Sequence, residues 1–134
     1  MSHNDELLFC SRNTNVNLVE LHPDQIQIFR LWQIYLENLN PLLKVTHTPT
    51  LQPRIIDAAS DVTNISPPLE ALMFGIYCVA IFSLSHRECL KVFNLPRADL
   101  LVKYQLGARE ALLGCGLWRT GDRDCLTALH FYLV

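Results

Sequence analysis

The sequence predicts an all-α protein built as an array of antiparallel helix pairs, and three observations support that prediction. Half of the 134 residues are apolar and only five are glycine, which is typical of a packed core rather than of a disordered tail. Apolar side chains recur with a period of 3.6 residues in several segments, and no segment alternates with period 2 for long enough to form a strand. Short turns marked by Pro or Gly separate these segments.

The N-terminal part of the chain contains a polar stretch and then the first strong helix. Residues 1–21 are rich in Asn with only short apolar pairs, so we expect a flexible leader there. The helix is expected to open at Pro23, whose missing N–H would be unpaired in a first turn anyway, and to run to about Asn38, before Asn40 and Pro41. The residues of its apolar face follow helical spacing and are Ile28, Leu31, Trp32, Tyr35 and Leu39.

The middle of the chain is expected to contain a connection and a second helix. Two prolines and several β-branched residues leave no helical period from Leu42 to Thr50. Thr50 is then expected to cap a helix that runs through about Ser60. The side chains expected to pack inward from these two segments are Leu42, Leu43, Val45, Ile55, Ile56 and Ala59.

The most apolar helix follows. Ser66-Pro67-Pro68 with Glu70 in the first turn predicts a helix start, because the hydroxyl and the carboxylate can both serve unpaired N–H groups. The apolar run from Ala71 to Leu84 is interrupted by Ser83 and is shorter than the roughly 18 to 20 residues that a membrane span needs. The sequence therefore predicts a buried core helix here.

Two more helices are expected next. Ser85-His86-Arg87-Glu88 is a capping box, which predicts a short helix ending near Phe93. A longer helix is expected to begin at Pro96 and to end at Gly114 or Gly116, where a left-handed C-cap costs least. The apolar side of that helix is formed by Leu101, Tyr104, Ala108, Leu112 and Cys115.

The last segments complete the expected array. Asp99 and Lys103 are four residues apart on the polar side of the longer helix and are expected to pair. A final helix is expected to start between Thr120 and Asp122 and soon reaches Val134, so we expect the array to be truncated. Its apolar part is formed by Leu126, Leu129, His130, Phe131, Tyr132 and Leu133.

Charge and cysteine usage exclude several classes of protein. The formal net charge is -2 and no run of Lys or Arg occurs, which argues against autonomous nucleic-acid binding. The cysteines are odd in number and the N-terminus lacks the apolar stretch of a secretory signal. We therefore expect reduced thiols, in the cytosol or the nucleus, at Cys10, Cys78, Cys89, Cys115 and Cys125.

Motifs of enzymes and metal sites are not found in the sequence. His86 and Cys89 come nearest to a ligand pair, but no second pair lies at metal-site spacing, so a solvent-facing histidine and a core thiol are favoured. Cys78 lies in an apolar helix, where burial raises the thiol pKa and keeps the group inert. We therefore predict that the chain is not an enzyme and assign it no catalytic, cofactor-binding or metal residue.

Aromatic and loop residues leave two further interpretations. The aromatic residues at helical spacing are expected in the core, with a ligand pocket between the Trp32 and Tyr77 helices as the alternative, and they are Phe29, Trp32, Tyr35, Phe74, Tyr77 and Phe82. His47 and the pair Trp118-Arg119 are expected to anchor loops. Arg119, Asp122, Arg123 and Asp124 are expected to form a solvated helix start.

A long stretch of the chain resembles a known family. The segments Ile28-Phe29-Arg30-Leu31-Trp32-Gln33-Ile34-Tyr35 through Pro41, and Lys44-Val45-Thr46-His47-Thr48-Pro49, resemble the opening of the fungal-specific transcription factor domain. That domain is also called the middle homology region, or the xylanolytic-activator-type regulatory domain, of zinc-cluster transcription factors. The resemblance continues through residues 70–77, 83–89 and 100–104 to Leu129-Phe131-Tyr132-Leu133, and so covers about residues 22–134.

The resemblance implies a function in transcription. Residues 22–134 would be the N-terminal half of a helical regulatory region in a nuclear zinc-cluster regulator. In that family a separate six-cysteine zinc cluster binds DNA, so zinc and DNA contact would lie outside this chain. The expected partners are another copy of the chain or the transcriptional machinery, with no membrane. Two alternatives stay open: a helical module that senses a small-molecule effector, and a free-standing, dimerising inhibitor of full-length relatives.

Overall fold

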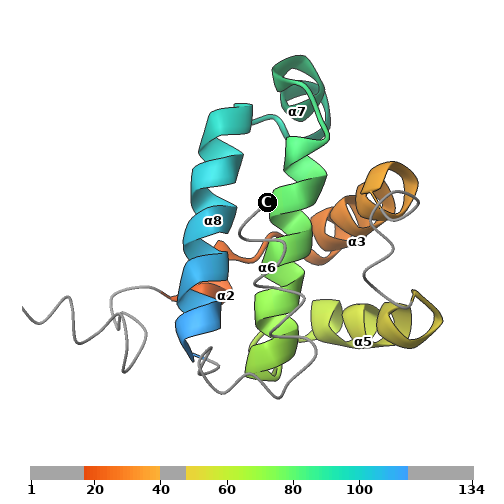
Figure 1. Cartoon of the computed structure of the whole chain (residues 1–134), viewed down its shortest axis with the longest axis vertical. Helices are drawn as coiled ribbons and strands as arrows, with labels where there is room; N and C mark the ends of the chain where they lie inside the picture. The colour runs from red at the N-terminus through yellow and green to blue at the C-terminus, as the bar shows by residue number, and fades with distance from the viewer. Residues whose placement is uncertain (1–16, 40–47, 115–134) are drawn as a thin grey trace, which may run out of the picture.

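The computed structural model describes residues 17–39 and 48–114, and these residues are helical throughout apart from short turns. This confirms the predicted all-α class. The elements are α2 (Leu18–Leu21), α3 (Gln25–Ile34), the π-helical turn η1 (Tyr35–Leu39), α5 (Thr48–Ser60), α6 (Pro67–Phe82), α7 (His86–Phe93) and α8 (Arg97–Gly114). Figure 1 shows α6 and α8 side by side and antiparallel, α3 and α5 on the other side of α6, and α7 at the end where α8 begins.

The centre of the fold is α6. Thirteen of its sixteen residues, from Leu69 to Ile81, are buried without interruption. A helix buried on all sides needs neighbours on all sides, and α8, α3 and η1 all pack against it. The buried core helix predicted from the apolar run is therefore confirmed.

Close packing of α6 on α8 depends on a glycine. A Cβ atom added at Gly107 of α8 would lie 2.4 Å from two ring carbons of Phe74 on α6. Real non-bonded carbon atoms approach no closer than about 3.5 Å without repulsion. Gly107 therefore allows the Phe74 ring to lie directly against the backbone of α8.

The beginning of the described chain corrects the expected leader. Residues Leu18–Leu21, which we expected to be flexible, form the short helix α2, and Asn17 caps it by accepting the Val19 N–H at 3.1 Å. Leu18 is buried, and α2 packs against α8. The local cap and one buried leucine outweigh the polar composition of this stretch, so the expected leader does not extend to Leu21. Residues 1–16 lie outside the described part.

The helix expected from Pro23 begins two residues later. Asp24 is the N-cap, because its side chain accepts the Gln27 N–H at 2.9 Å, and Pro23 lies before the cap. The helical stretch reaches Leu39 as expected, but its last turn, η1, is a π-helix. The predicted apolar face is confirmed: Ile28, Leu31, Trp32 and Tyr35 are buried, and Leu39 is packed against the core.

Helix α5 differs from its prediction in two ways. It begins at Thr48, so Thr50 lies within its first turn and is not its cap. Ile55 and Ala59 are buried as predicted, but Ile56 is 46% exposed. The buried face is Leu51, Ile55, Ala58 and Ala59, at i, i+4, i+7 and i+8, and Ile56 falls about 100° away from Ile55 around the helix. The predicted inward residues Leu42, Leu43 and Val45 lie outside the described residues.

The two predicted helix starts at Ser66 and Ser85 have different outcomes. Ser66 is the N-cap of α6 with Pro67 in the first turn, but its hydroxyl makes no capping hydrogen bond, so the predicted role of that hydroxyl is wrong. At α7 the predicted capping box is confirmed: Ser85 Oγ accepts the Glu88 N–H at 3.1 Å, and the Ser85 N–H donates to Glu88 Oε1 at 2.8 Å. The hydrogen bond that the Ser85 N–H donates to the Glu88 carboxylate lowers the pKa of Glu88, because it favours the ionised form.

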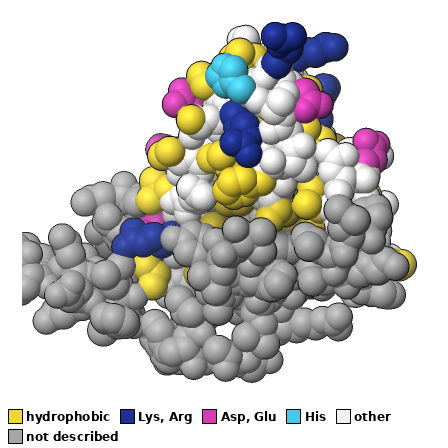
Figure 2. Space-filling view, turned by 45° about the horizontal axis from the view of Figure 1, so that its top comes forward, with side chains coloured by type: hydrophobic (Ala, Val, Ile, Leu, Met, Phe, Trp, Pro, Cys, Tyr) yellow, Lys and Arg dark blue, Asp and Glu magenta, His cyan; other side chains and the backbone are white. Residues whose placement is uncertain are grey.

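Helices α7 and α8 meet at a tight turn. Asn94 ends α7 in the left-handed conformation (φ 58°), a conformation that asparagine tolerates better than most residues. Figure 2 looks toward this end of the molecule and shows Lys, Arg and hydrophobic side chains interleaved on it. Helix α8 follows from Arg97, one residue after the predicted start, and reaches the predicted Gly114.

The two sides of α8 were predicted with partial success. Tyr104, Ala108 and Leu112 are buried and Leu101 is partly buried, as expected. The expected pair of Asp99 with Lys103 is not among the ion pairs of the described residues. Instead, Lys103 Nζ lies 5.6 Å from the centre of the Tyr104 ring. The predicted helix after residue 120, with Cys115 and Gly116, lies outside the described residues.

Candidate functional site

A buried polar cluster lies between the end of α2 and the middle of α6. His22 Nδ1 is 3.0 Å from the Tyr77 hydroxyl, and His22 Nε2 is 3.1 Å from Glu70 Oε2. The imidazole is 0% exposed and the Glu70 side chain 11% exposed. The contact is therefore a hydrogen-bonded unit inside the protein rather than a surface ion pair.

The periodicity of α6 places the members of this cluster. Glu70, Phe74 and Tyr77 are at i, i+4 and i+7, so they share one face of the helix. His22 immediately follows α2, and its ring lies 4.4 Å from the Phe74 ring and edge-on to the Tyr77 ring at 5.8 Å, measured between centroids. Tyr104 of α8 lies behind, with its ring 5.2 Å from that of Tyr77. The histidine thus joins the end of α2 to α6, and α8 packs behind the Tyr77 ring.

The environment of the cluster keeps the Tyr77 phenol protonated. Burial, together with the neighbouring Tyr104 and Glu70, raises the pKa of Tyr77 well above its ordinary value. An imidazole with its proton on Nε2 can donate to Glu70 and accept from the Tyr77 hydroxyl at Nδ1. In this arrangement both ring nitrogens have a partner.

This geometry limits what the cluster can do chemically. A general base or a metal ligand needs a ring nitrogen that reaches a substrate or an ion. Both nitrogens of His22 are engaged within the protein and its side chain has no solvent exposure. The cluster therefore acts as a clamp that fixes α2 on α6, and Glu70, which was expected to serve the N–H groups at the start of α6, is hydrogen-bonded to His22.

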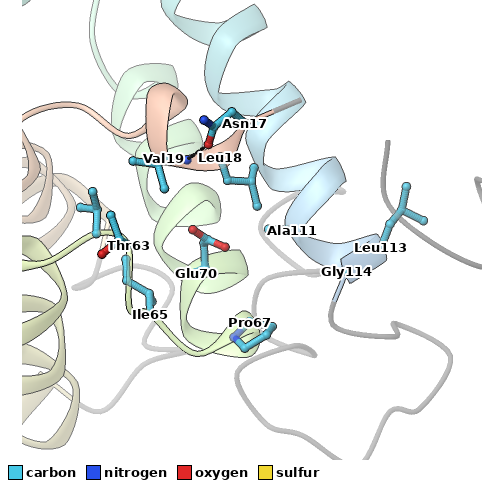
Figure 3. Close-up of a pocket in the computed structure, with 11 residues that line it drawn as sticks. Asn17, Leu18, Val19, Thr63, Ile65, Pro67, Glu70, Ala111, Leu113 and Gly114 are labelled. Carbon is cyan, nitrogen blue, oxygen red and sulfur yellow. Dashed lines mark hydrogen bonds between the residues drawn. The ribbon is translucent and has the colours of Figure 1, made fainter. Parts of the chain in front are cut away.

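A cavity of about 430 Å³ lies beside the cluster, between α2, the start of α6 and the end of α8. Figure 3 shows Glu70 among the residues of its lining, with the carboxylate turned toward α2. The lining residues are Asn17, Leu18, Val19, Val62, Thr63, Ile65, Pro67, Glu70, Ala111, Leu113 and Gly114. The cavity therefore combines aliphatic walls with one carboxylate.

The cysteine and histidine residues singled out in the sequence lie apart from this cavity. Cys78 and Cys89 are buried free thiols, and burial raises the pKa of Cys78 to about 12 and also raises that of Cys89. His86 is exposed on α7, so the predicted solvent-facing histidine and core thiol are confirmed. Within the described ranges no group of three His, Cys, Asp or Glu side chains could hold a metal ion.

The aromatic residues follow the core prediction with one exception. Trp32 and Tyr35 are buried and stacked at 5.5 Å, and the Trp32 indole N–H donates to Gln52 at 2.9 Å. Phe29 packs against the core, and Phe74 and Tyr77 are buried. Phe82 is 43% exposed, with the Arg97 guanidinium 5.5 Å from its ring centre, so its placement in the core was wrong.

The sequence reasoning missed the clamp and the cavity. The signal for the clamp was present, because Glu70 is an ionisable residue at the start of an apolar helix and is spaced i, i+7 from Tyr77. No local pattern connects either residue to His22, which is 48 residues before Glu70. The remaining candidates lie outside the described residues and are His47, Trp118, Arg119, Asp122, Arg123 and Asp124.

Among the described helices none combines the length and hydrophobicity that crossing a membrane requires.

Three comparisons with known proteins bear on the class of the protein. No protein-family model matches the chain, and no solved structure matches it. Curated proteins do match.

The similar proteins are fungal regulators. The chain is 58% identical over 130 residues to the transcriptional regulator nsrM of Aspergillus novofumigatus, covering 97% of this chain and 18% of nsrM. It is 58% identical over 132 residues to the transcriptional regulator AacuB of Aspergillus aculeatus, covering 98% of this chain and 18% of AacuB. It is 39% identical over 118 residues to the pyriculol/pyriculariol biosynthesis cluster transcription factor 1 of Pyricularia oryzae, covering 88% of this chain and 16% of that protein. The chain is thus homologous to one segment, less than a fifth in length, of fungal transcription regulators.

Proposed function

We propose that the chain is a regulatory region, without direct DNA contact, of a fungal zinc-cluster transcription factor, and that it acts in the nucleus. The observation that carries the proposal is the 58% identity with transcriptional regulators over 97% of the chain. In the resemblance described above, residues 22–134 form the N-terminal half of the middle homology region. Since the Pyricularia relative is a biosynthesis cluster transcription factor, we propose that the genes controlled here also belong to a biosynthetic cluster.

The structure supports a non-catalytic role. The ionisable residues brought together in the interior, His22, Glu70 and Tyr77, are occupied by one another. The longest described helices are used to build a core around α6. What such a fold offers to other molecules is its surface and its cavity, which suits regulation through contacts with protein or with a small effector.

A reporter assay tests the regulatory proposal. The whole chain is inserted between an unrelated DNA-binding domain and an activation domain in a fungal host, and reporter output is compared with that of a flexible linker of equal length. We expect the chain to change the output and the Ile26→Ala variant, altered at a side chain that is 68% exposed, to behave like the wild type. A Phe74→Asp variant, which places a charge in the core, should lose the effect. Equal output from the wild type, Phe74→Asp and the linker would refute a regulatory role.

A DNA-binding measurement tests the second part of the proposal. Fluorescence anisotropy with labelled duplex DNA at physiological salt should show at most weak, sequence-independent association, because the formal net charge of the chain is -2. Sequence-specific binding to any duplex by this chain would contradict the absence of direct DNA contact.

Sensing of a small molecule is a second candidate function, and the cavity favours it. Its volume, about 430 Å³, falls in the range of small-molecule pockets, roughly 300 to 1,000 Å³. Its position beside α2, rather than between the Trp32 and Tyr77 helices, differs from the pocket considered from the sequence. A metabolite screen by thermal shift tests it, since a ligand of the native state raises the melting temperature. Hits must lose their effect when Ala111→Phe fills the cavity and keep it in Ile26→Ala.

The third candidate function is inhibition of full-length relatives, in which the chain would act by dimerising. Sedimentation of the full chain over a range of concentrations decides this proposal. A chain that stays monomeric at high concentration would exclude dimerisation.

A further inference from the structure

One end of the molecule has a charge opposite to that of the rest. It contains residues 82–97, from the end of α6 through α7 to the start of α8. The described part of the chain has seven Lys and Arg residues, and three of them lie there. It has nine Asp and Glu residues, and only one of them lies there. With histidine neutral, these sixteen residues carry +2, and the remaining described residues, with four cations and eight anions, carry -4. The charge is therefore segregated.

The single acidic residue within residues 82–97 is already occupied, and the next one, Asp99, is exposed in the first turn of α8. The Glu88 carboxylate accepts the N–H of Ser85 in the capping box of α7. Arg87 and Lys91 are exposed, four residues apart on α7, and neither forms an ion pair with another described residue. Two cations on adjacent turns of one helix are thus available to an external anion.

Exposed apolar side chains lie among these cations. Phe82, Leu90 and Leu95 are 43%, 41% and 43% exposed, and each is a large side chain. Leu90 is between Arg87 and Lys91 on α7. Figure 2 shows hydrophobic and basic side chains, with acidic ones beside them, on the face that it brings forward. Apolar exposure that is rimmed by polar groups is typical of protein interaction surfaces.

Arg97 makes part of this surface rigid. Its Nε donates to the Leu84 carbonyl at 2.8 Å and its Nη2 to the Phe82 carbonyl at 3.2 Å, so it satisfies acceptors at the C-terminal end of α6. Its guanidinium also lies 5.5 Å from the centre of the Phe82 ring. The arginine and the phenylalanine therefore hold a fixed position, and little conformational entropy would be lost when a partner binds there.

We propose that this surface, termed the α7 end face and formed by Phe82, Arg87, Leu90, Lys91, Leu95 and Arg97, binds an acidic amphipathic peptide segment of a partner protein. Carboxylates of the segment would pair with Arg87 and Lys91, and its apolar side chains would cover Phe82, Leu90 and Leu95. Such a segment matches both the charge and the hydrophobicity of the face. A nucleic acid would match the charge alone, because two of the three exposed apolar side chains are aliphatic and offer no stacking surface. The inference goes beyond the proposed regulatory role and does not depend on it.

The test is a binding titration of the full chain. The probe is a labelled synthetic peptide of about 20 residues in which Leu and Phe recur every three or four positions among Asp and Glu. Its binding is followed by anisotropy, and the site is mapped by NMR shifts of backbone amides. We expect the shifts to concentrate in residues 82–97 and the affinity to fall as NaCl is raised from about 50 to about 500 mM, because salt screens exposed charges. The double variant Arg87→Ala/Lys91→Ala should weaken binding by about tenfold.

Two controls make the result decisive. Arg30→Ala removes an exposed cation from α3, outside residues 82–97, and should leave the affinity within about twofold. A peptide with Asn and Gln in place of Asp and Glu should bind at least about tenfold more weakly. The proposal is overturned if the acidic peptide does not bind at millimolar concentration, if Arg30→Ala weakens binding as much as the double variant does, or if the uncharged peptide binds equally well. Tighter binding of a single-stranded oligonucleotide at the same face would also overturn it.

Discussion

Replacing Gly107 with alanine would set two opposing effects against each other in α8. Inside a helix, alanine is favoured over glycine by about 1 kcal/mol. At Gly107, however, the new Cβ would lie 2.4 Å from Cδ1 and Cε1 of Phe74 and 2.9 Å from Cζ. The Phe74 ring is fully buried, with the His22 ring 4.4 Å away and the Tyr77 ring 5.3 Å away, so it cannot turn aside. Overpacking costs about 1 to 3 kcal/mol, and so short a contact belongs at the upper end. We expect a net loss of about 1 to 2 kcal/mol.

Urea unfolding of the full chain, followed by far-UV circular dichroism, measures this loss. Comparing Gln105→Ala with Gln105→Gly, at an exposed interior position of the same helix, reports the propensity term alone, and the glycine variant should be less stable by about 0.5 to 1 kcal/mol. Combining Gly107→Ala with Phe74→Leu should cost less than the sum of the two single changes, because the smaller side chain relieves the overlap. If Gly107→Ala is as stable as the wild type or more stable, helix propensity dominates and the argument for close packing at this point is refuted.

Three further predictions concern the clamp, the cap and a thiol. His22→Ala should cost about 1 to 3 kcal/mol in urea unfolding, because it removes the two buried hydrogen bonds to Glu70 and Tyr77; a loss under about 0.5 kcal/mol would mean that α2 is not held by the clamp. Ser85→Ala should cost about 1 kcal/mol through loss of the capping box, and an unchanged midpoint would argue against it. Cys78 should not react with a thiol reagent at pH 8 until the chain unfolds, because burial raises its pKa to about 12. Since the unfolded thiol ionises at a lower pH, this group should also make stability fall as the pH rises from about 9 toward about 12; rapid labelling of the native protein or a flat stability profile in this range would contradict the assigned burial.

Local sequence patterns predicted the helices well because their determinants lie within a few residues of one another. The capping box at Ser85 and Glu88 involves residues three apart, and the apolar face of α3 repeats within a few turns. Errors at helix starts also had local causes. At α3 the carboxylate of Asp24 provides the cap, so the helix begins at Gln25, two residues after the expected start at Pro23. In α2 a single asparagine cap and one buried leucine are too small a signal against a polar background.

The clamp could not be predicted in the same way, because its members are far apart in sequence. Glu70 was interpreted from its own neighbourhood, where a carboxylate near a helix start ordinarily interacts with the helix dipole. Its real partner, His22, is brought to it only when α2 packs against the core. Likewise, Gly107 has no special meaning until the Phe74 ring of another helix lies against it. Contacts of this kind depend on tertiary packing, which sequence periodicity does not encode.

The π-helical turn of η1 has a consequence for how this segment can change during evolution. A π turn contains one more residue than the α-helical turn that it replaces. Removing one residue such as Glu37 from this turn would therefore convert it to an ordinary α-helical turn and leave its flanking residues in nearly the same orientation. Asn38, which donates to the Ser83 hydroxyl of α6 at 3.0 Å, would keep its place against α6. Relatives that lack one residue in this segment should therefore retain the contact with α6, so that a one-residue gap there would not indicate a different packing of the helix.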